Sequence, residues 1–93
     1  MPGWVRKGDA NEVGGRVIAN TASTVYVNGK LAALKGSLIS THNPSPDIHE
    51  GRVIQDGSGT VIVEGKPAAF KGAHETCSHT QVEASSDVII PGG

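Results

Sequence analysis

The hydrophobic positions of this chain occur in short runs that glycine interrupts every few residues. β-Branched residues with a two-residue alternation predict strands at 24–27 and 60–63, and shorter apolar runs predict strands at 16–18 and 52–54. Nowhere does the chain have the length and apolar spacing that a helix needs. The pattern therefore predicts an all-β chain whose short strands form small, strongly twisted sheets.

Two dipeptides predict tight turns after the longer strands. Asn28-Gly29 is the strongest short-range indication of a hairpin, because a type I′ turn needs positive φ at both central residues. Glu64-Gly65 takes the equivalent place in the second half of the chain, with a less favourable first residue. Each half is therefore expected to contain one hairpin.

The chain contains an internal repeat. Residues 15–36 match residues 51–72 at 13 of 22 positions without a gap, far above the one or two matches expected by chance. A third, partial copy follows, since residues 86–92 have the pattern of residues 59–65. Repeats of this size cannot bury their own apolar faces, so the copies must pack on one another.

The copies can be related by translation, which would give a short solenoid, or by rotation about one axis. The partial last copy favours rotation, because a ring of three can close with a partial unit whereas the end of a solenoid needs a cap. We expect a single domain over residues 1–93, with repeats at about 8–36, 37–72 and 73–93. Its predicted shape is a compact pseudo-threefold β body of short hairpins with equivalent loops gathered at one end.

Composition adds a need for further stabilisation. The chain has 93 residues, of which 37% are hydrophobic, and a single cysteine, Cys77. Small domains with so modest a core usually depend on a disulfide, a metal or a partner. An internal disulfide is impossible with one cysteine, so a metal or a partner is expected.

Charge and hydropathy exclude several classes of protein. The net charge of −1, without a block of like charges, gives no basis for binding nucleic acid. The sequence has no apolar segment of membrane-spanning length and no signal peptide at its start. We therefore expect a protein that is made in the cytoplasm.

All four histidines and the cysteine lie in two segments, 37–50 and 73–82, which follow the repeated strands at equivalent places. Imidazole nitrogen and thiolate sulfur are the ligands that zinc prefers, and a structural zinc site fills all four positions with protein atoms. The expected ligands of one structural zinc are His42, His49, Cys77 and His79. His74 is held in reserve as a replacement for His79.

A catalytic zinc would instead keep three protein ligands and a water, with Glu50 or Glu75 as general base. Five candidate ligands for four positions favour a saturated site, and a chain this small is unsuited to an ordinary substrate pocket. The expectation is that the protein is not an enzyme. A small zinc-dependent hydrolase and a zinc-free β-repeat interaction module remain the alternatives.

The segment Lys66-Pro67-Ala68-Ala69-Phe70-Lys71-Gly72, after the strand at 60–63, resembles the PAAR-repeat proteins. These form the tips on the trimeric spikes of type VI secretion systems and contractile phage tails. The first copy, residues 28–36, follows the pattern with Leu31 in place of proline, and Gly8-Asp9 resembles the opening of the same unit.

The sequence departs from the family pattern at several positions. Leu34 and Phe70 stand where the family has arginine, and Ser37 and Ala73 replace the aspartate of its Gly-Asp pair. Val13 stands where many members have a histidine. The resemblance implies a small conical, pseudo-threefold all-β fold with one zinc near its apex. In the family this zinc is bound by three histidines and a cysteine at the position of Cys77, so His79 is expected to replace the missing histidine.

The resemblance also implies a function and partners. The protein would cap and sharpen a trimeric spike, either of the VgrG type or of a phage tail, by docking through its broad base. It would be a monomer by itself, would be delivered on contraction or stay in a virion tail, and would contact a target membrane only transiently. Candidates for the core or for the docking base are Val61, Val63, Val88, Ile89 and Ile90.

Overall fold

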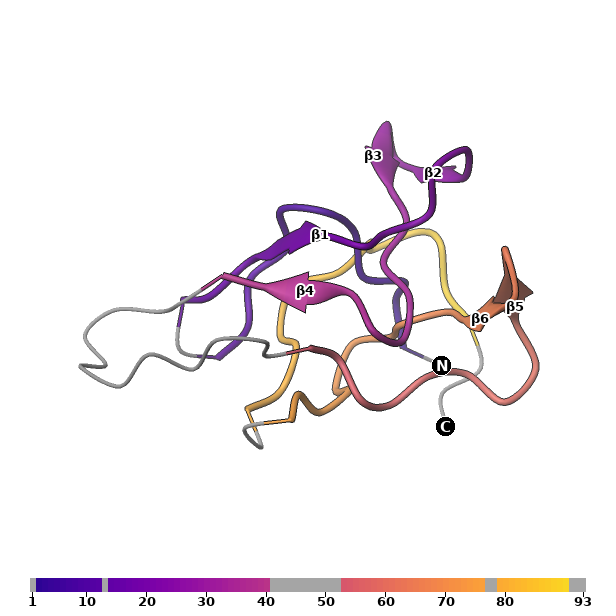
Figure 1. Ribbon diagram of the computed structural model, residues 1–93. Helices are drawn as coiled ribbons and strands as arrows, with labels where there is room; N and C mark the ends of the chain where they lie inside the picture. Colours follow the sequence, from indigo (N-terminus) through magenta and orange to yellow (C-terminus); the bar gives the residue numbers. More distant parts are fainter. Residues whose placement is uncertain (1, 13, 41–52, 77–78, 91–93) are drawn as a thin grey trace.

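The computed structural model describes residues 2–12, 14–40, 53–76 and 79–90, and these residues form short strands, turns and bridges without a helix. The strands are β1 (Val17–Ala19), β2 (Tyr26–Val27), β3 (Lys30–Leu31), β4 (Leu38–Ile39), β5 (Ile62–Val63) and β6 (Lys66–Pro67). They pair as β1–β4, β2–β3 and β5–β6, all antiparallel (Figure 1). The predicted all-β class is confirmed. No helix among the described residues is long and apolar enough to span a membrane.

The two predicted hairpins form at equivalent positions. Asn28 and Gly29 join β2 to β3 with φ of 54° and 80°, and Glu64 and Gly65 join β5 to β6 with φ of 53° and 81°. Positive φ at both central residues is the type I′ geometry that matches the twist of the flanking strands. Both turn predictions are therefore confirmed, although glutamate is an uncommon residue in this region of φ.

The two ends of the chain pair in the same antiparallel way as the two arms of each hairpin, and we count this terminal pair as the third hairpin. Trp4 N donates to Val88 O at 2.9 Å, and Gly3 forms an antiparallel bridge with Ile89. The matching bonds in the other two hairpins, also 2.9 Å long, run from Ala32 N to Val25 O and from Ala68 N to Val61 O. The last copy therefore follows the predicted pattern, and the N-terminal segment supplies its missing strand, so that residues 3–4 and 88–89 lie side by side.

A closed ring of backbone hydrogen bonds relates the three units by rotation. Val5 N donates to Ala69 O (3.0 Å), Ala69 N donates to Ala33 O (3.0 Å), and Ala33 N donates to Val5 O (2.9 Å). None of the three residues is exposed to solvent. A translational solenoid cannot form such a cycle, so the rotational, pseudo-threefold arrangement is confirmed.

The gapless repeat alignment is wrong by one residue in the first strands. It equates Ile18 with Ile54, but the hydrogen bonds make Val17 the counterpart of Ile54. Gly8 N donates to Val17 O, and the equivalent Gly36 N donates to Ile54 O, both at 2.8 Å. Accordingly Val17 and Ile54 are buried and Ile18 is 44% exposed. The cause is a bulge between Val17 and Ala19, which adds one residue to the first copy.

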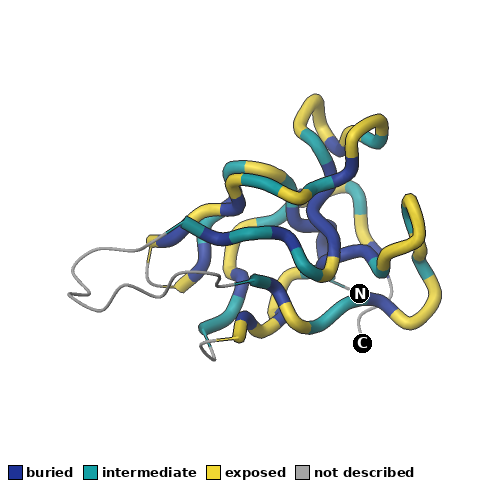
Figure 2. Tube along the Cα trace, in the orientation of Figure 1, coloured by how far each residue is buried: buried dark blue, intermediate teal, exposed yellow. Residues whose placement is uncertain are grey.

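The core consists of two apolar clusters. One lies under the hairpins and contains Trp4, Ala22, Val27, Ala32, Leu34, Ala68 and Ile90. The other lies toward the opposite end and contains Val5, Val17, Ala33, Ile39, Ile54, Ala69 and Ala73. Trp4 connects them, because its indole Nε1 donates to Ala33 O at 3.0 Å. Along the described part of the trace, buried positions face the inside of the molecule (Figure 2).

Candidate functional site

Two loops that are closed by equivalent backbone hydrogen bonds lie at the end opposite the hairpins, which we call the apical end. Asn11 N donates to Gly15 O at 2.8 Å, and Glu75 N donates to His79 O at 2.8 Å. Each bond closes a five-residue loop, 11–15 or 75–79, and β1 and β4 extend to the same end (Figure 1). The opposite end, formed by the three hairpins, is called the base.

Of the predicted zinc ligands, only His79 and the reserve His74 belong to the described residues. His42, His49 and Cys77 lie outside them. Within residues 2–12, 14–40, 53–76 and 79–90 there is no group of three or more His, Cys, Asp or Glu side chains that could hold a metal. The ligand set therefore stays a prediction, with His79 fixed at the end of the 75–79 loop.

His74 has a partner of its own on the flank of the molecule. Its Nδ1 lies 2.9 Å from Asp56 Oδ2, and its backbone N–H donates to the same oxygen at 3.0 Å. That backbone hydrogen bond, followed by the contact with the ring, lowers the pKa of the Asp56 carboxyl. Since Asp56 contacts Nδ1, a metal would have to bind His74 through Nε2.

The apical end contains a buried polar cluster that the sequence analysis missed. Asn11, Glu75 and Gln81 are 3%, 0% and 1% exposed. Glu75 Oε2 accepts a hydrogen bond from Asn11 Nδ2 at 2.8 Å and another from Gln81 Nε2. Asn11 Oδ1 in turn accepts from Gly15 N at 2.7 Å, so the cluster connects the two apical loops.

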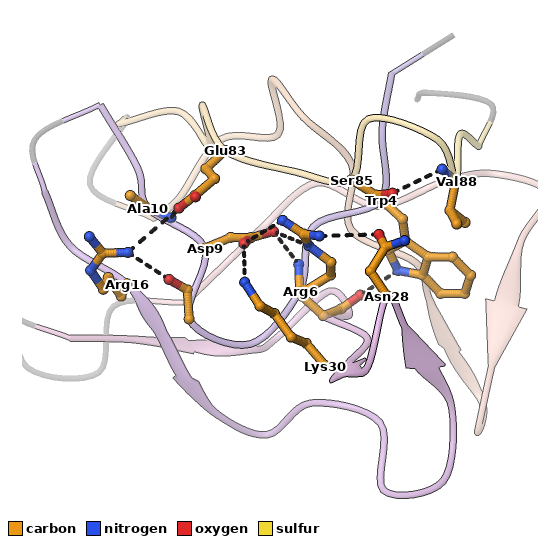
Figure 3. A network of polar contacts seen from close by, with 12 residues as sticks. Trp4, Arg6, Asp9, Ala10, Arg16, Asn28, Lys30, Glu83, Ser85 and Val88 are labelled. Atoms are coloured by element: carbon orange, nitrogen blue, oxygen red, sulfur yellow. Dashed lines mark hydrogen bonds and ion pairs between the residues drawn. The ribbon is translucent and has the colours of Figure 1, made fainter.

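A second missed feature is the ion pair of Arg6 with Asp9 (Figure 3). Arg6 Nε and its backbone N each lie 2.8 Å from Asp9 Oδ2, and the fully buried carboxylate also has Lys30 Nζ at 4.0 Å. The side-chain hydrogen bond to Asp9 raises the pKa of Arg6. Arg6 Nη1 donates to Asn28 Oδ1 at 3.1 Å, which extends the network to the tip of the first hairpin.

Arg6 occupies the arginine position of a third motif copy. Arg6 and Leu34 each begin a turn that contains a positive-φ glycine, Gly8 in one case and Gly36 in the other. In both turns the backbone N–H of the first residue donates to the side chain three residues later: Arg6 N to Asp9 Oδ2, and Leu34 N to Ser37 Oγ. The shared spacing of Arg6-x-Gly8-Asp9 and Leu34-x-Gly36-Ser37 could have revealed this copy in the sequence. Trp4-Val5 in place of Ala-Ala concealed it.

The base presents three exposed apolar side chains at equivalent positions. Tyr26, Ile62 and Ile89 are 62%, 55% and 55% exposed. Each is a paired residue of its own hairpin, and their partners are Leu31, Pro67 and Gly3. Among the earlier candidates for core or base, Ile90 is buried, and Val61, Val63 and Val88 pack against the core cluster under the hairpins. Only Ile89 of that set is an exposed residue of the base.

Polar contacts fasten each described hairpin tip to a neighbouring hairpin. The Glu64 carboxylate accepts hydrogen bonds from the backbone N–H groups and hydroxyls of Ser23 and Thr24 at 3.0–3.2 Å. Asn28 Nδ2 donates to Asp87 Oδ1 at 2.9 Å. The backbone bond from Ser23 lowers the pKa of Glu64, and the side-chain bond from Asn28 lowers the pKa of Asp87.

The described residues enclose no pocket. A family model described as the PAAR motif matches this sequence over residues 7–80 and again over 45–93. A search of curated proteins finds no match. The geometry and the family model thus agree on a small β-repeat fold.

Proposed function

The chain belongs to the PAAR-motif family, and we propose that it caps and sharpens the central spike of a contractile injection apparatus. The family implies a protein associated with spike tips. The finer role proposed here is structural: the whole chain, residues 1–93, acts as one monomeric domain that docks through its base and points its apical end forward.

The observation that supports docking is the equivalence of Tyr26, Ile62 and Ile89 around the axis. Exposed apolar side chains that repeat with threefold symmetry are suited to a partner that offers the same apolar surface three times. The partner proposed is the blunt end of a trimeric spike, of the VgrG type or of a phage tail, because a trimer presents every surface group three times. Fastening of the hairpins by Glu64 and Asn28 holds the base in shape before docking, which lowers the entropy lost on association.

At the apical end, we propose one structural zinc bound by His42, His49, Cys77 and His79. The donor types are those of a closed zinc site. The described part of the chain supports this, since the backbone of His79 is held by Glu75 N and both apical loops are closed in the same way. Such a zinc would join the apical segments and stabilise the fold by roughly 10 kcal/mol.

The proposed role requires no catalysis, so the zinc should be structural. X-ray absorption at the zinc edge tests this, because it distinguishes a site with four protein ligands from one that keeps a water. We expect four protein ligands and no bound water. The protein would be made in the cytoplasm, mounted on the spike, delivered on contraction or retained in a virion tail, and would touch a target membrane only in passing.

The docking surface is tested by charge substitution. In the triple variant Tyr26→Asp, Ile62→Asp, Ile89→Asp we expect binding to the spike trimer of the same bacterium or phage to be lost, since three carboxylates would have to be desolvated at the interface. Ile18→Asp is the matched control, because Ile18 is also exposed but lies on β1, away from the hairpins. Retained binding of a correctly folded triple variant would contradict the proposal.

A further inference from the structure

Three lysines occupy the same position in the three repeats, and the proposed function assigns them no role. We propose that Lys7, Lys35 and Lys71 belong to the docking surface, where each forms an ion pair with a carboxylate from one subunit of the spike trimer. This inference rests on the proposed docking through the base. It adds the chemistry of the partner, which is an aspartate or glutamate side chain that the trimer presents three times.

Backbone hydrogen bonds establish that the three lysines are equivalent. Each donates its backbone N–H to a carbonyl of a neighbouring hairpin, at 2.8, 2.8 and 2.9 Å, in the pairs Lys7 with Leu31, Lys35 with Pro67, and Lys71 with Gly3. The three acceptor residues are the strand partners of the exposed apolar residues of the base, which are Tyr26, Ile62 and Ile89. Every hairpin therefore has one apolar residue and one lysine on either side of the same residue.

The strand register places each lysine on the same face as the apolar residue of its row. Residues directly opposite each other in antiparallel strands project to one side of the sheet. In the first hairpin the row is Tyr26, Leu31 and Lys7, and the adjacent bridge of Arg6 with Ala32 has the same register. Both ends of this row are exposed. The other two rows, also exposed at both ends, are Ile62, Pro67 and Lys35, and Ile89, Gly3 and Lys71.

The lysine ammonium groups are available to a partner. Within the part of the chain that the structure describes, none of the three forms a hydrogen bond or an ion pair within 4.0 Å. The other described cations with carboxylate partners at this distance are Arg6, Arg16 and Lys30. Besides the larger effect of His74, Lys35 helps to lower the pKa of the Asp56 carboxyl, although the two groups are not paired.

The carboxylates of the base are already engaged within the chain. Glu64 accepts hydrogen bonds from Ser23 and Thr24, and Asp87 accepts one from Asn28. The charge that the base offers to a partner is therefore mainly positive, and a carboxylate is the complementary group.

Lysine recurs although its neighbours in the motif do not. The residue before it is Arg6, Leu34 or Phe70, and the residue two positions after it is Asp9, Ser37 or Ala73. Only the lysine and the following glycine are common to all three repeats. The glycines have φ of 92°, 93° and 95°, which accounts for their presence. The exposed lysines have no such backbone requirement, and a partner with threefold symmetry explains why all three are present.

Ion pairs would add what the apolar contacts of the base lack. Hydrophobic contact has no direction, so Tyr26, Ile62 and Ile89 alone do not fix how the chain is rotated about the axis of the spike. Complementary charges fix the register of an interface and accelerate association. Three equivalent lysines favour the rotations that place every lysine beside a carboxylate at once.

The test is the triple variant Lys7→Gln, Lys35→Gln, Lys71→Gln in the full chain, with binding kinetics measured on the immobilised spike trimer of the same bacterium or phage. We expect the affinity to fall by about 10- to 100-fold, because each exposed ion pair contributes about two- to fivefold. Added salt should slow the association of the wild-type chain and have little effect on that of the triple variant. Lys7→Arg, Lys35→Arg, Lys71→Arg keeps the charges and should keep the affinity within about twofold of the wild type.

Arg16→Gln is the matched control for each single lysine variant, since it also removes one exposed positive charge. Arg16 follows the 11–15 loop at the apical end, so its substitution should leave spike binding unchanged. Circular dichroism shows whether each variant is folded. If the triple glutamine variant does not fold, the three single variants decide, and each should lose about two- to fivefold in affinity.

The outcomes separate this inference from the proposed function. No binding of the wild-type chain to the trimer would overturn the proposed docking itself. Wild-type binding that folded glutamine variants retain in full would overturn only the role of the lysines. Wild-type binding to vesicles that contain phosphatidylserine, lost in the triple variant while spike binding is unchanged, would assign the lysines to a membrane surface and would also overturn the proposal.

Discussion

At the base, three hairpins repeat one geometry, whereas at the apical end the connections between the same repeats differ in length and chemistry. The loops 11–15 and 75–79 have five residues, while the connection between β4 and Val53 is far longer. Both ends extend from one ring, formed by Val5, Ala33 and Ala69.

Under the proposed function, the difference follows from what each end would contact. A face that meets a threefold partner must present the same group three times, and Tyr26, Ile62 and Ile89 do so. A site for a single metal ion needs one set of ligands, which the repeats can divide among unequal loops. The base therefore preserves the repeat, and the apical end departs from it.

The largest expected effect is that of metal removal, which would first disrupt the structure of the apical end. Incubation with excess chelator should unfold the chain, because binding of a structural zinc contributes roughly 10 kcal/mol to folding. Circular dichroism and thermal unfolding measure this. A chelated sample that keeps its β signal and its unfolding temperature would show that the ring and the base are stable without a metal.

The next effect concerns the ion pair between Arg6 and Asp9, which only one of the three repeats contains. Arg6→Leu leaves the buried Asp9 carboxylate without its guanidinium partner, and the expected loss of stability is about 3–5 kcal/mol. The double variant Arg6→Leu, Asp9→Ser recreates the Leu34 and Ser37 pair of the second repeat. It should be more stable than Arg6→Leu alone.

Urea unfolding of the two single variants and of the double variant measures this coupling. Additive losses would mean that the repeats are not interchangeable at this position, and that Arg6 acts through contacts other than Asp9.

The smallest expected effect is the response of the base to acid. Hydrogen bonds lower the pKa values of Glu64 and Asp87, so the unfolded chain takes up protons at a higher pH than the folded chain. Their stabilising contribution is complete above the ordinary carboxyl pKa and is lost as pH falls through the lowered values. The unfolding temperature should therefore drop below about pH 4.

The double variant Glu64→Gln, Asp87→Asn should have a flatter acid limb in the same experiment, while its apical zinc affinity stays unchanged. An acid limb as steep as that of the wild type would assign the pH dependence to other carboxyls, such as Asp56 on the flank.

Much of the base could be predicted from the sequence, because its determinants are local. Asn28-Gly29 and Glu64-Gly65 specify their turns within a few residues, and the internal repeat gave the alignment of Val88 with Val61. The pairing of Trp4 with Val88 joins the two ends of the chain, and no local pattern indicates it.

The rest depends on packing that the sequence pattern does not encode. The bulge after Val17 adds a residue that a gapless alignment cannot represent. Glutamate is usually a surface residue, so Glu75 can be recognised as part of a buried polar cluster only when its burial and its amide partners are known. The predicted ligands His42, His49 and Cys77 lie outside the described residues, so they remain predictions.

Native mass spectrometry of the chain co-expressed with its spike protein would test the central claim most directly. We predict one copy of the chain and one zinc ion per spike trimer, because a pseudo-threefold monomer would cover a true threefold face once. Three copies per trimer, or no complex with a well-folded chain, would contradict the account of the base. A complex without zinc would contradict the account of the apical end.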